Sequence, residues 1–216
     1  MNGGSVDYTD NRVQMEDTAT MLPIFIALGV ATAVTLFPGT GTAAPAPAPG
    51  HYKLESEHTF PSLEFPHMGL SIWRGKFNRT SGTATLDRAA KTGTVNVKVD
   101  TTSIDFGLDS INAYALRPEW LNTARFPTMS YSGTLVFAGE QPVAVDGQLT
   151  LLGVTRPLRL TLNTFKCIDH PFYKKEACGA DAEGELDRAD FGMKQFTEDG
   201  AGKIRLRIQV EAVKED

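Results

Sequence analysis

Apolar residues recur in this chain with a period of two, and that pattern limits the fold more than any other feature. The segment 93–101, GTVNVKVDT, alternates without a break and places Val95, Val97 and Val99 on one side. Such alternation is typical of a β-strand with one buried face and one solvated face. Further candidate strands lie between turn residues at 58–68, 72–78, 82–87, 127–137, 143–151, 158–165, 181–186 and 204–213. The chain after residue 50 is therefore predicted to be all-β.

One segment breaks the alternation. Residues 108–124, LDSINAYALRPEWLNTA, have helical spacing, with Ile111 and Tyr114 able to share a face before Pro118 interrupts it. We expect one or two short helices that cap one end of the domain. About eight antiparallel strands in a chain of this length favour an up-and-down barrel over the alternative, an open sandwich. The interior of such a barrel has room for one small ligand.

The N-terminal region has the pattern of an export signal. Residues 22–37 form a nearly continuous apolar run, shorter than the roughly 20 residues of a membrane-spanning helix. Small residues follow at 42–44, as at a signal-peptide cleavage site. Residues 1–20 are acidic, which does not fit a positive n-region, and translation starting at Met15 or Met21 would remove that conflict. An uncleaved anchor is the alternative.

These features divide the chain into three parts. Residues 1–44 are an N-terminal extension with a cleaved signal peptide, placed at about residues 21–44, and residues 45–50 are an Ala/Pro linker. Residues 51–216 are the barrel domain. We expect a periplasmic or secreted protein.

The two cysteines support export. Cys167 and Cys178 are separated by ten residues. An even count in an exported chain indicates one disulfide. A metal or redox pair is the alternative, but no His–Cys spacing and no C-x-x-C motif supports it.

Charge and motifs exclude two classes of function. Residues 1–44 hold four of the 26 acidic and one of the 21 basic residues, so the rest has 22 acidic and 20 basic residues and a net charge of −2. A nearly neutral domain gives no electrostatic case for binding nucleic acid. The sequence also lacks G-x-S-x-G, H-E-x-x-H and P-loop motifs, and its four histidines are scattered. We therefore do not expect an enzyme.

Four groups of residues together resemble a known family. They are 52–69, with Tyr52-Lys53-Leu54 and His67-Met68-Gly69; 102–127, with Ser103-Ile104-Asp105, Leu116-Arg117 and Phe126-Pro127; 145–158, VDGQLTLLGVTRPL; and 188–193, RADFGM. The last two are similar to the G-x-L-T-x-x-G-V-T-[KR]-P and R-x-D-F-G signatures of the YceI-like family of exported, lipocalin-like polyisoprenoid-binding proteins. The chain departs from that family at 112–115, where an Asp and a His are common, and in its cysteine pair.

The resemblance implies an exported carrier that holds a long isoprenoid lipid, of the quinone or polyprenyl type, inside a lipocalin-like barrel with no covalent cofactor and no metal. Twelve residues are candidate ligand contacts: Leu63, Phe65, His67, Trp73, Phe77, Phe106, Arg117, Trp120, Phe126, Tyr131, Phe165 and Phe191. Among them, His67 could meet a quinone oxygen or a phosphate, and Arg117 an anionic headgroup. For each apolar member, packing in an ordinary core is an equally good interpretation.

Two other functions stay open. The barrel could be structural or stress-related and act through an unknown protein partner, or it could be an unrecognised enzyme that acts on a lipid. An exposed edge strand could also pair two copies in a homodimer.

Overall fold

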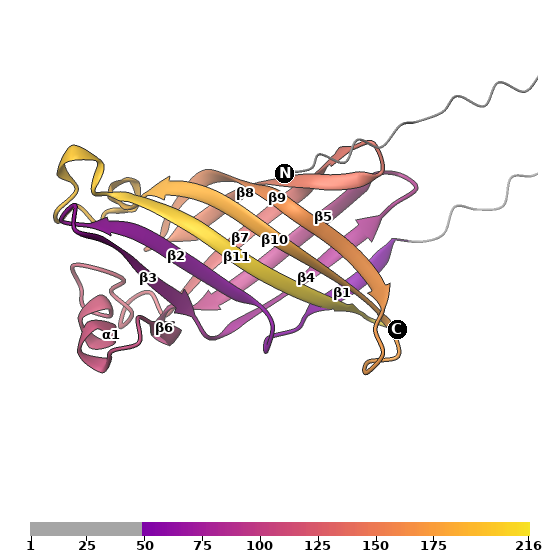
Figure 1. Ribbon diagram of the computed structural model, residues 1–216, viewed down its shortest axis with the longest axis horizontal. Coiled ribbons are helices and arrows are strands. Elements are labelled where there is room, and N and C mark those ends of the chain that lie inside the picture. Colours follow the sequence, from indigo (N-terminus) through magenta and orange to yellow (C-terminus); the bar gives the residue numbers. More distant parts are fainter. Residues whose placement is uncertain (1–48) are drawn as a thin grey trace, which may run out of the picture. The chain divides into compact units, whose positions relative to one another are not determined.

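The computed structural model describes residues 49–216 as one strand-rich body (Figure 1). The predicted signal peptide and residues 45–48 of the predicted linker lie outside the described residues. The strands begin at Gly50 and end at Lys214. No helix among residues 49–216 is long and apolar enough to cross a membrane.

Eleven strand segments form a single antiparallel sheet that closes on itself. β1 closes it by pairing with β4 on one side and with β11 on the other. The segments are β1 (Gly50–Leu54), β2 (Phe60–His67), β3 (Ser71–Phe77), β4 (Thr80–Asp87), β5 (Thr92–Asp100), β6 (Ile104–Asp105), β7 (Thr128–Ala138), β8 (Gln141–Leu151), β9 (Val154–Asp169), β10 (Glu176–Asp187) and β11 (Lys203–Lys214).

The eleven segments make eight barrel strands, because the first three strands are each broken once. β11 pairs with β2 through residues 205–209 and with β1 through residues 212–214, so β1 and β2 occupy one strand position. By the same reasoning, β3 and β4 together occupy one strand position, and β5 and β6 together occupy the next. The prediction of an eight-stranded antiparallel barrel with a short helical segment near one end is confirmed.

The alternation in the sequence sets which side chains point inwards. Val95, Val97 and Val99 of β5 face the interior. On the outside, Glu183 of β10 lies opposite Arg207 of β11, with which it forms an ion pair. The charged residues of the last strands thus form a solvated outer face.

The helical segment is shorter than predicted. Helix α1 spans Asp109–Ala115, and residues 116–126 continue as hydrogen-bonded turns instead of a second helix. Pro118 lacks an amide hydrogen and disfavours helical geometry in the residue before it, which explains the early end. In Figure 1, α1 lies at the same end of the barrel as the β2–β3 turn and the loop between β10 and β11.

Two strands are longer than the alternation indicated. β9 runs on to Asp169 and β10 starts at Glu176, so the two form a long hairpin beyond the predicted 158–165 and 181–186. The added part of β10, EACGA, consists mostly of small residues, and their apolar periodicity is too weak to mark a strand. β1 was not among the alternating segments because five residues are too few to establish a period.

Candidate functional site

The barrel contains a cavity of about 200 Å³. Its wall comes from all eight strand positions, mostly from inward-pointing aliphatic side chains. No Asp, Glu, Lys, Arg or His lines it. The aliphatic part of the wall is Leu54, Leu63, Ala84, Leu86, Val95, Val97, Val99, Leu135, Val145, Leu149, Leu158, Leu160, Leu162, Ala180, Ala182, Leu206, Ile208, Val210 and Ala212.

Near one end of the barrel, a buried tyrosine of the cavity wall contacts a group of charged residues. Tyr52 is 3 % exposed, and its hydroxyl donates a hydrogen bond to the carboxylate of Glu176. Arg88 Nη2 lies 2.9 Å from the other oxygen of the same carboxylate, and Lys214 Nζ lies 4.0 Å from the first. Glu176 is therefore held between donors at the rim.

In this network the pKa of Tyr52 is raised and the pKa of Glu176 is lowered. Burial, together with the hydrogen bond to Glu176, raises the pKa of Tyr52 to about 12. For Glu176, burial acts to raise the pKa, but the hydrogen bonds from Tyr52 and Arg88 outweigh it and the pKa is lowered. At neutral pH the carboxylate is charged and the phenol is neutral.

A disulfide lies near the same end. Cys167 and Cys178 are opposite each other across β9 and β10, and they are joined as predicted. Cys178 also lines the cavity, next to the cluster that contains Tyr52 and Leu86. The disulfide fastens the β9–β10 hairpin where the wall meets the rim.

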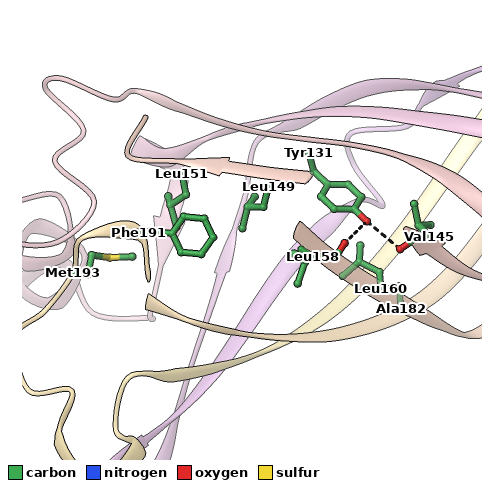
Figure 2. Close-up of a cluster of buried hydrophobic side chains, with 9 residues drawn as sticks. All are labelled: Tyr131, Val145, Leu149, Leu151, Leu158, Leu160, Ala182, Phe191 and Met193. Carbon is green, nitrogen blue, oxygen red and sulfur yellow. Dashed lines mark hydrogen bonds between the residues drawn. The ribbon is translucent and has the colours of Figure 1, made fainter. Parts of the chain in front are cut away.

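The other end is covered by the segment after β10. Figure 2 shows Phe191 and Met193 packed near Leu149 and Leu151. Arg188, 6 % exposed, donates hydrogen bonds to the carbonyl oxygens of Met193 at 3.0 Å and of Phe196 at 2.8 Å. These bonds shape the loop, so the arginine of the RADFGM motif has a structural role here.

Tyr131 lies in the cavity wall between the two ends of the barrel. Its hydroxyl lies 3.2 Å from the carbonyl oxygen of Val145 and 3.0 Å from that of Leu158, and it shares one proton between them (Figure 2). Burial raises the pKa of Tyr131. The ring fits because Gly147 has no side chain, and a Cβ there would overlap the phenol.

Thr59 and Thr80 both line the cavity, but their hydroxyls differ in hydrogen bonding. Thr59 donates to the carbonyl oxygen of Glu211 at 3.1 Å and accepts from its amide at 3.1 Å. Thr80 is 5 % exposed, and its Oγ1 has no hydrogen-bond partner among the described residues.

The twelve predicted contact residues fall into two groups. Leu63, Phe77, Tyr131 and Phe165 line the cavity. The other eight lie outside its wall. These are Phe65, His67, Trp73, Phe106, Arg117, Trp120, Phe126 and Phe191.

Four of the second group pack together near the α1 end. Phe65, Trp73 and Phe106 have ring centroids 5.9–6.4 Å apart, and the His67 ring stacks on Trp73 at 4.2 Å. This aromatic cluster lies on β2, β3 and the residue after β6. All four rings are partly buried, and Phe106 packs against the buried cluster of Phe77, Val99 and Ile104.

The remaining members contact neighbours other than the cavity. The Arg117 guanidinium lies over the Tyr114 ring at 4.8 Å, and Trp120 carries Arg188 over its ring at 4.9 Å. Phe126 lies against Gly153. His67 and Arg117, the two predicted headgroup contacts, each pack on an aromatic ring, and neither lines the cavity.

The aliphatic residues of the cavity wall were not among the predicted ligand contacts, although the alternation in the sequence indicated that they point inwards. The alternation that predicted the strands also places Val95, Val97 and Val99 inwards, as it does Leu206 and Ile208. Selecting aromatic residues favoured large side chains. Some of the aromatic residues, such as Phe77 and Phe165, line the cavity, but most of its wall is aliphatic.

The 112–115 departure from the family pattern has a structural explanation at its first residue. Asn112 Oδ1 accepts the amide hydrogen of Phe106 at 2.7 Å, and its Nδ2 donates to Asp105 Oδ1 at 3.2 Å. Asn112 thus ties α1 to β6 and lies away from the cavity wall. Within residues 49–216, no group of three or more His, Cys, Asp or Glu is placed to hold a metal ion.

Comparisons with known proteins agree with this architecture. A protein family described as the YceI-like domain matches residues 52–213. Protein YceI of Escherichia coli O6:H1 is 32% identical over 167 residues, which cover 76% of this chain and 87% of that protein.

Solved structures share the fold at lower identity. The Campylobacter jejuni YCEI protein has a TM-score of 0.59 and 21% identity, covering 70% of this chain and 90% of that chain. A polyisoprenoid binding domain from Saccharophagus degradans, implicated in plant cell wall breakdown, has a TM-score of 0.56 and 15% identity, covering 76% of this chain and 98% of that chain.

Proposed function

This chain belongs to the YceI-like family, and from that premise we propose that it is an exported, non-enzymatic carrier that holds an isoprenoid lipid, of the quinone or polyprenyl type, inside its barrel. The observation that carries the proposal is the cavity with no charged side chain in its wall. Such a wall suits a hydrocarbon tail, because neither partner has to lose the hydration of an ion.

The energetics of burial are sufficient for useful affinity. Each buried CH₂ contributes about 0.8 kcal/mol, so one five-carbon isoprene unit contributes roughly 4 kcal/mol gross. Loss of free translation and rotation removes a good part of this. Two units supply about 8 kcal/mol gross, which without any polar contact exceeds the association cost where that cost lies at the lower end of its range, about 4 kcal/mol.

The size of the cavity sets how much of the lipid is enclosed. A cavity of about 150 Å³ holds benzene in another protein, so about 200 Å³ here accommodates a short prenyl segment. Ligand pockets commonly measure about 300–1,000 Å³. A longer tail has to push wall side chains aside or leave part of itself outside.

Two further observations support the proposal. A polyisoprenoid-binding domain from another organism has the same fold. The disulfide is of the kind that persists in oxidising compartments outside the cytosol, which supports export to the periplasm or beyond.

Filling the cavity tests the proposal. Ala84 of β4 lines the cavity, and its neighbour Thr83 points outwards and is exposed. We expect Ala84→Phe to occupy the space and abolish binding of geraniol, a two-unit prenyl alcohol, measured by isothermal titration calorimetry. Thr83→Phe adds the same ring outside the barrel and should bind like the unaltered chain. Failure of the unaltered chain to bind prenyl ligands would instead favour the structural barrel that acts through a protein partner.

A further inference from the structure

Thr80 is the one described residue whose buried side-chain oxygen has no hydrogen-bond partner. It begins β4 and borders the cavity at 5 % exposure. The other hydroxyl-bearing residues of the cavity lining either have hydrogen-bond partners or are not buried. Those with partners are Tyr52, Thr59, Thr85 and Tyr131, and those not buried are Ser62 and Ser130. Burying a hydroxyl without a partner is costly, so native proteins rarely keep one without a reason.

The residue lies at an interruption in the barrel wall. The first two strand positions pair at residues 50–53 with 83–86 and at residues 62–67 with 71–76. Between these ladders, residues 54–61 face residues 77–82 with no ladder pair. Thr80 is in this gap, and the cavity reaches both of its sides, at Thr59 and at Thr80.

Residues on both sides of the gap are hydrogen-bonded to other segments of the barrel. Thr59 bonds to Glu211 of β11, and Asn78 N donates to the carbonyl oxygen of Ser103 at 3.0 Å. Arg79, the nearest basic residue along the chain, is engaged outside by Asp100 at 2.9 Å. The ammonium of Lys76, at the edge of the gap, lies over the Phe60 ring at 4.3 Å and does not line the cavity. On its cavity side the gap therefore offers one free hydroxyl and no cation.

This combination discriminates between headgroups. A carbonyl, phenol or alcohol oxygen is neutral, and a single hydroxyl partner satisfies it. A phosphate would bring negative charge into a wall that has no Lys, Arg or His, where it would be unpaired and dehydrated.

We propose that the lipid in this barrel has a neutral oxygen-bearing head, which hydrogen-bonds to Thr80 Oγ1 inside the cavity, so that the site selects prenyl alcohols, phenols or quinones over prenyl phosphates. This inference rests on the proposed carrier function. It assigns the orientation of the ligand, with its polar end at the gap between β1–β2 and β3–β4 and its hydrocarbon along the aliphatic wall.

The test uses three matched ligands with the full chain: geraniol, geranyl phosphate, and the hydrocarbon in which hydrogen replaces the geraniol hydroxyl. The variants are Thr80→Val, which keeps the shape and removes the hydroxyl, and Thr80→Ser, which keeps the hydroxyl. Thr83→Val is the control, because it makes the same change on the outer face of the same strand. Calorimetry gives each dissociation constant, and thermal unfolding without ligand shows that each variant folds.

We expect Thr80→Val to weaken geraniol binding by about 2- to 10-fold, the effect of one hydrogen bond, and to leave hydrocarbon binding unchanged. Thr80→Ser should retain geraniol affinity, and Thr83→Val should change neither ligand. The unaltered chain should prefer geraniol to geranyl phosphate. Because the lost hydroxyl is unpaired, Thr80→Val should unfold at the same temperature as the unaltered chain or higher.

The outcomes separate this inference from the function on which it rests. If the unaltered chain binds none of the three ligands, the carrier function fails. If it binds geraniol but Thr80→Val binds it equally well, or if geranyl phosphate binds more tightly than geraniol, the carrier stands and the Thr80 site is wrong. Should Thr80→Val fail to fold, Thr80→Ala compared with Thr80→Ser gives the same decision.

Discussion

At the scale of single residues, the interior depends on where a side chain is missing. Tyr131 reaches the carbonyl oxygens of Val145 and Leu158 only because Gly147 leaves room for its ring. The need is for space, because Gly147 is not among the residues with positive φ. The glycine therefore fixes the position of the largest residue in the middle of the wall.

Replacing Gly147 tests this packing. We expect Gly147→Ala to lower the free energy of unfolding by about 1–3 kcal/mol, because its methyl group overlaps the Tyr131 ring. Gly179→Ala is the control, since a Cβ there meets its nearest atom, the Val210 carbonyl oxygen, at an ordinary 3.4 Å. Urea denaturation of both variants measures the difference. Equal stability of the two would show that Tyr131 is free to move.

The Tyr52–Glu176 contact predicts a pH dependence. The folded state raises the pKa of Tyr52 from 10.0 to about 12, so the phenol stabilises the fold below pH 10 and this contribution is lost as the pH rises from about 10 to 12. Glu176, Arg88 and Lys214 are the charged groups that face it. Tyr52→Phe removes the titrating proton, so its stability should fall less steeply than that of the unaltered chain across this window. Parallel slopes in chemical denaturation at pH 9.5–12 would contradict the assignment.

At the scale of elements, the long hairpin of β9 and β10 needs its disulfide most. It extends beyond the alternating core to the rim, where small residues such as Ala177 and Gly179 give the strands little apolar area to bury. A cross-link there replaces packing that the sequence does not supply.

Removing the disulfide should therefore cost stability without changing the fold. For a loop of this length, the chain-entropy relation predicts a loss of about 3 kcal/mol in the double variant Cys167→Ala/Cys178→Ala. A reducing agent should destabilise the unaltered chain by a similar amount and leave the double variant unaffected. Denaturation midpoints with and without dithiothreitol give the comparison, and a double variant as stable as the oxidised chain would refute the role.

A comparison of the strands shows which strand ends the sequence pattern predicts. Strands with uninterrupted alternation, such as β5 and β11, were predicted to within one or two residues of their ends. The breaks between β1 and β2 and between β5 and β6 were not, because a break depends on how a strand meets its neighbours in the closed barrel. α1 is the one short α-helix of the segment predicted to be helical, and it ends before Pro118, the residue predicted to interrupt it.

For the candidate site, the sequence predicted an interior but not its open part. Of the predicted ligand contacts, Leu63 and Phe77 lie on the cavity wall, whereas Phe65 and Trp73 lie outside it and pack on each other. Both pairs alternate in the same way along β2 and β3. Only the curvature of the wall and the residues across from it decide whether a large side chain borders a space or fills it.

At the scale of the whole molecule, the volume of the cavity limits the ligand. A space of about 200 Å³ encloses a short prenyl segment. We expect affinity to rise steeply from prenol to geraniol and then to level off for farnesol and geranylgeraniol, because added units bury little new surface in the barrel. A series of dissociation constants that keeps rising with every unit would mean that the wall opens to admit the whole tail.

Native mass spectrometry of the chain purified from its exported form tests most directly whether the barrel carries an isoprenoid in its interior. We expect an added mass of one isoprenoid with a neutral head per chain, released by organic extraction and absent from Ala84→Phe. A chain that is ligand-free as purified, and that takes up neither prenyl alcohol nor prenylated quinone when these are added, would contradict it.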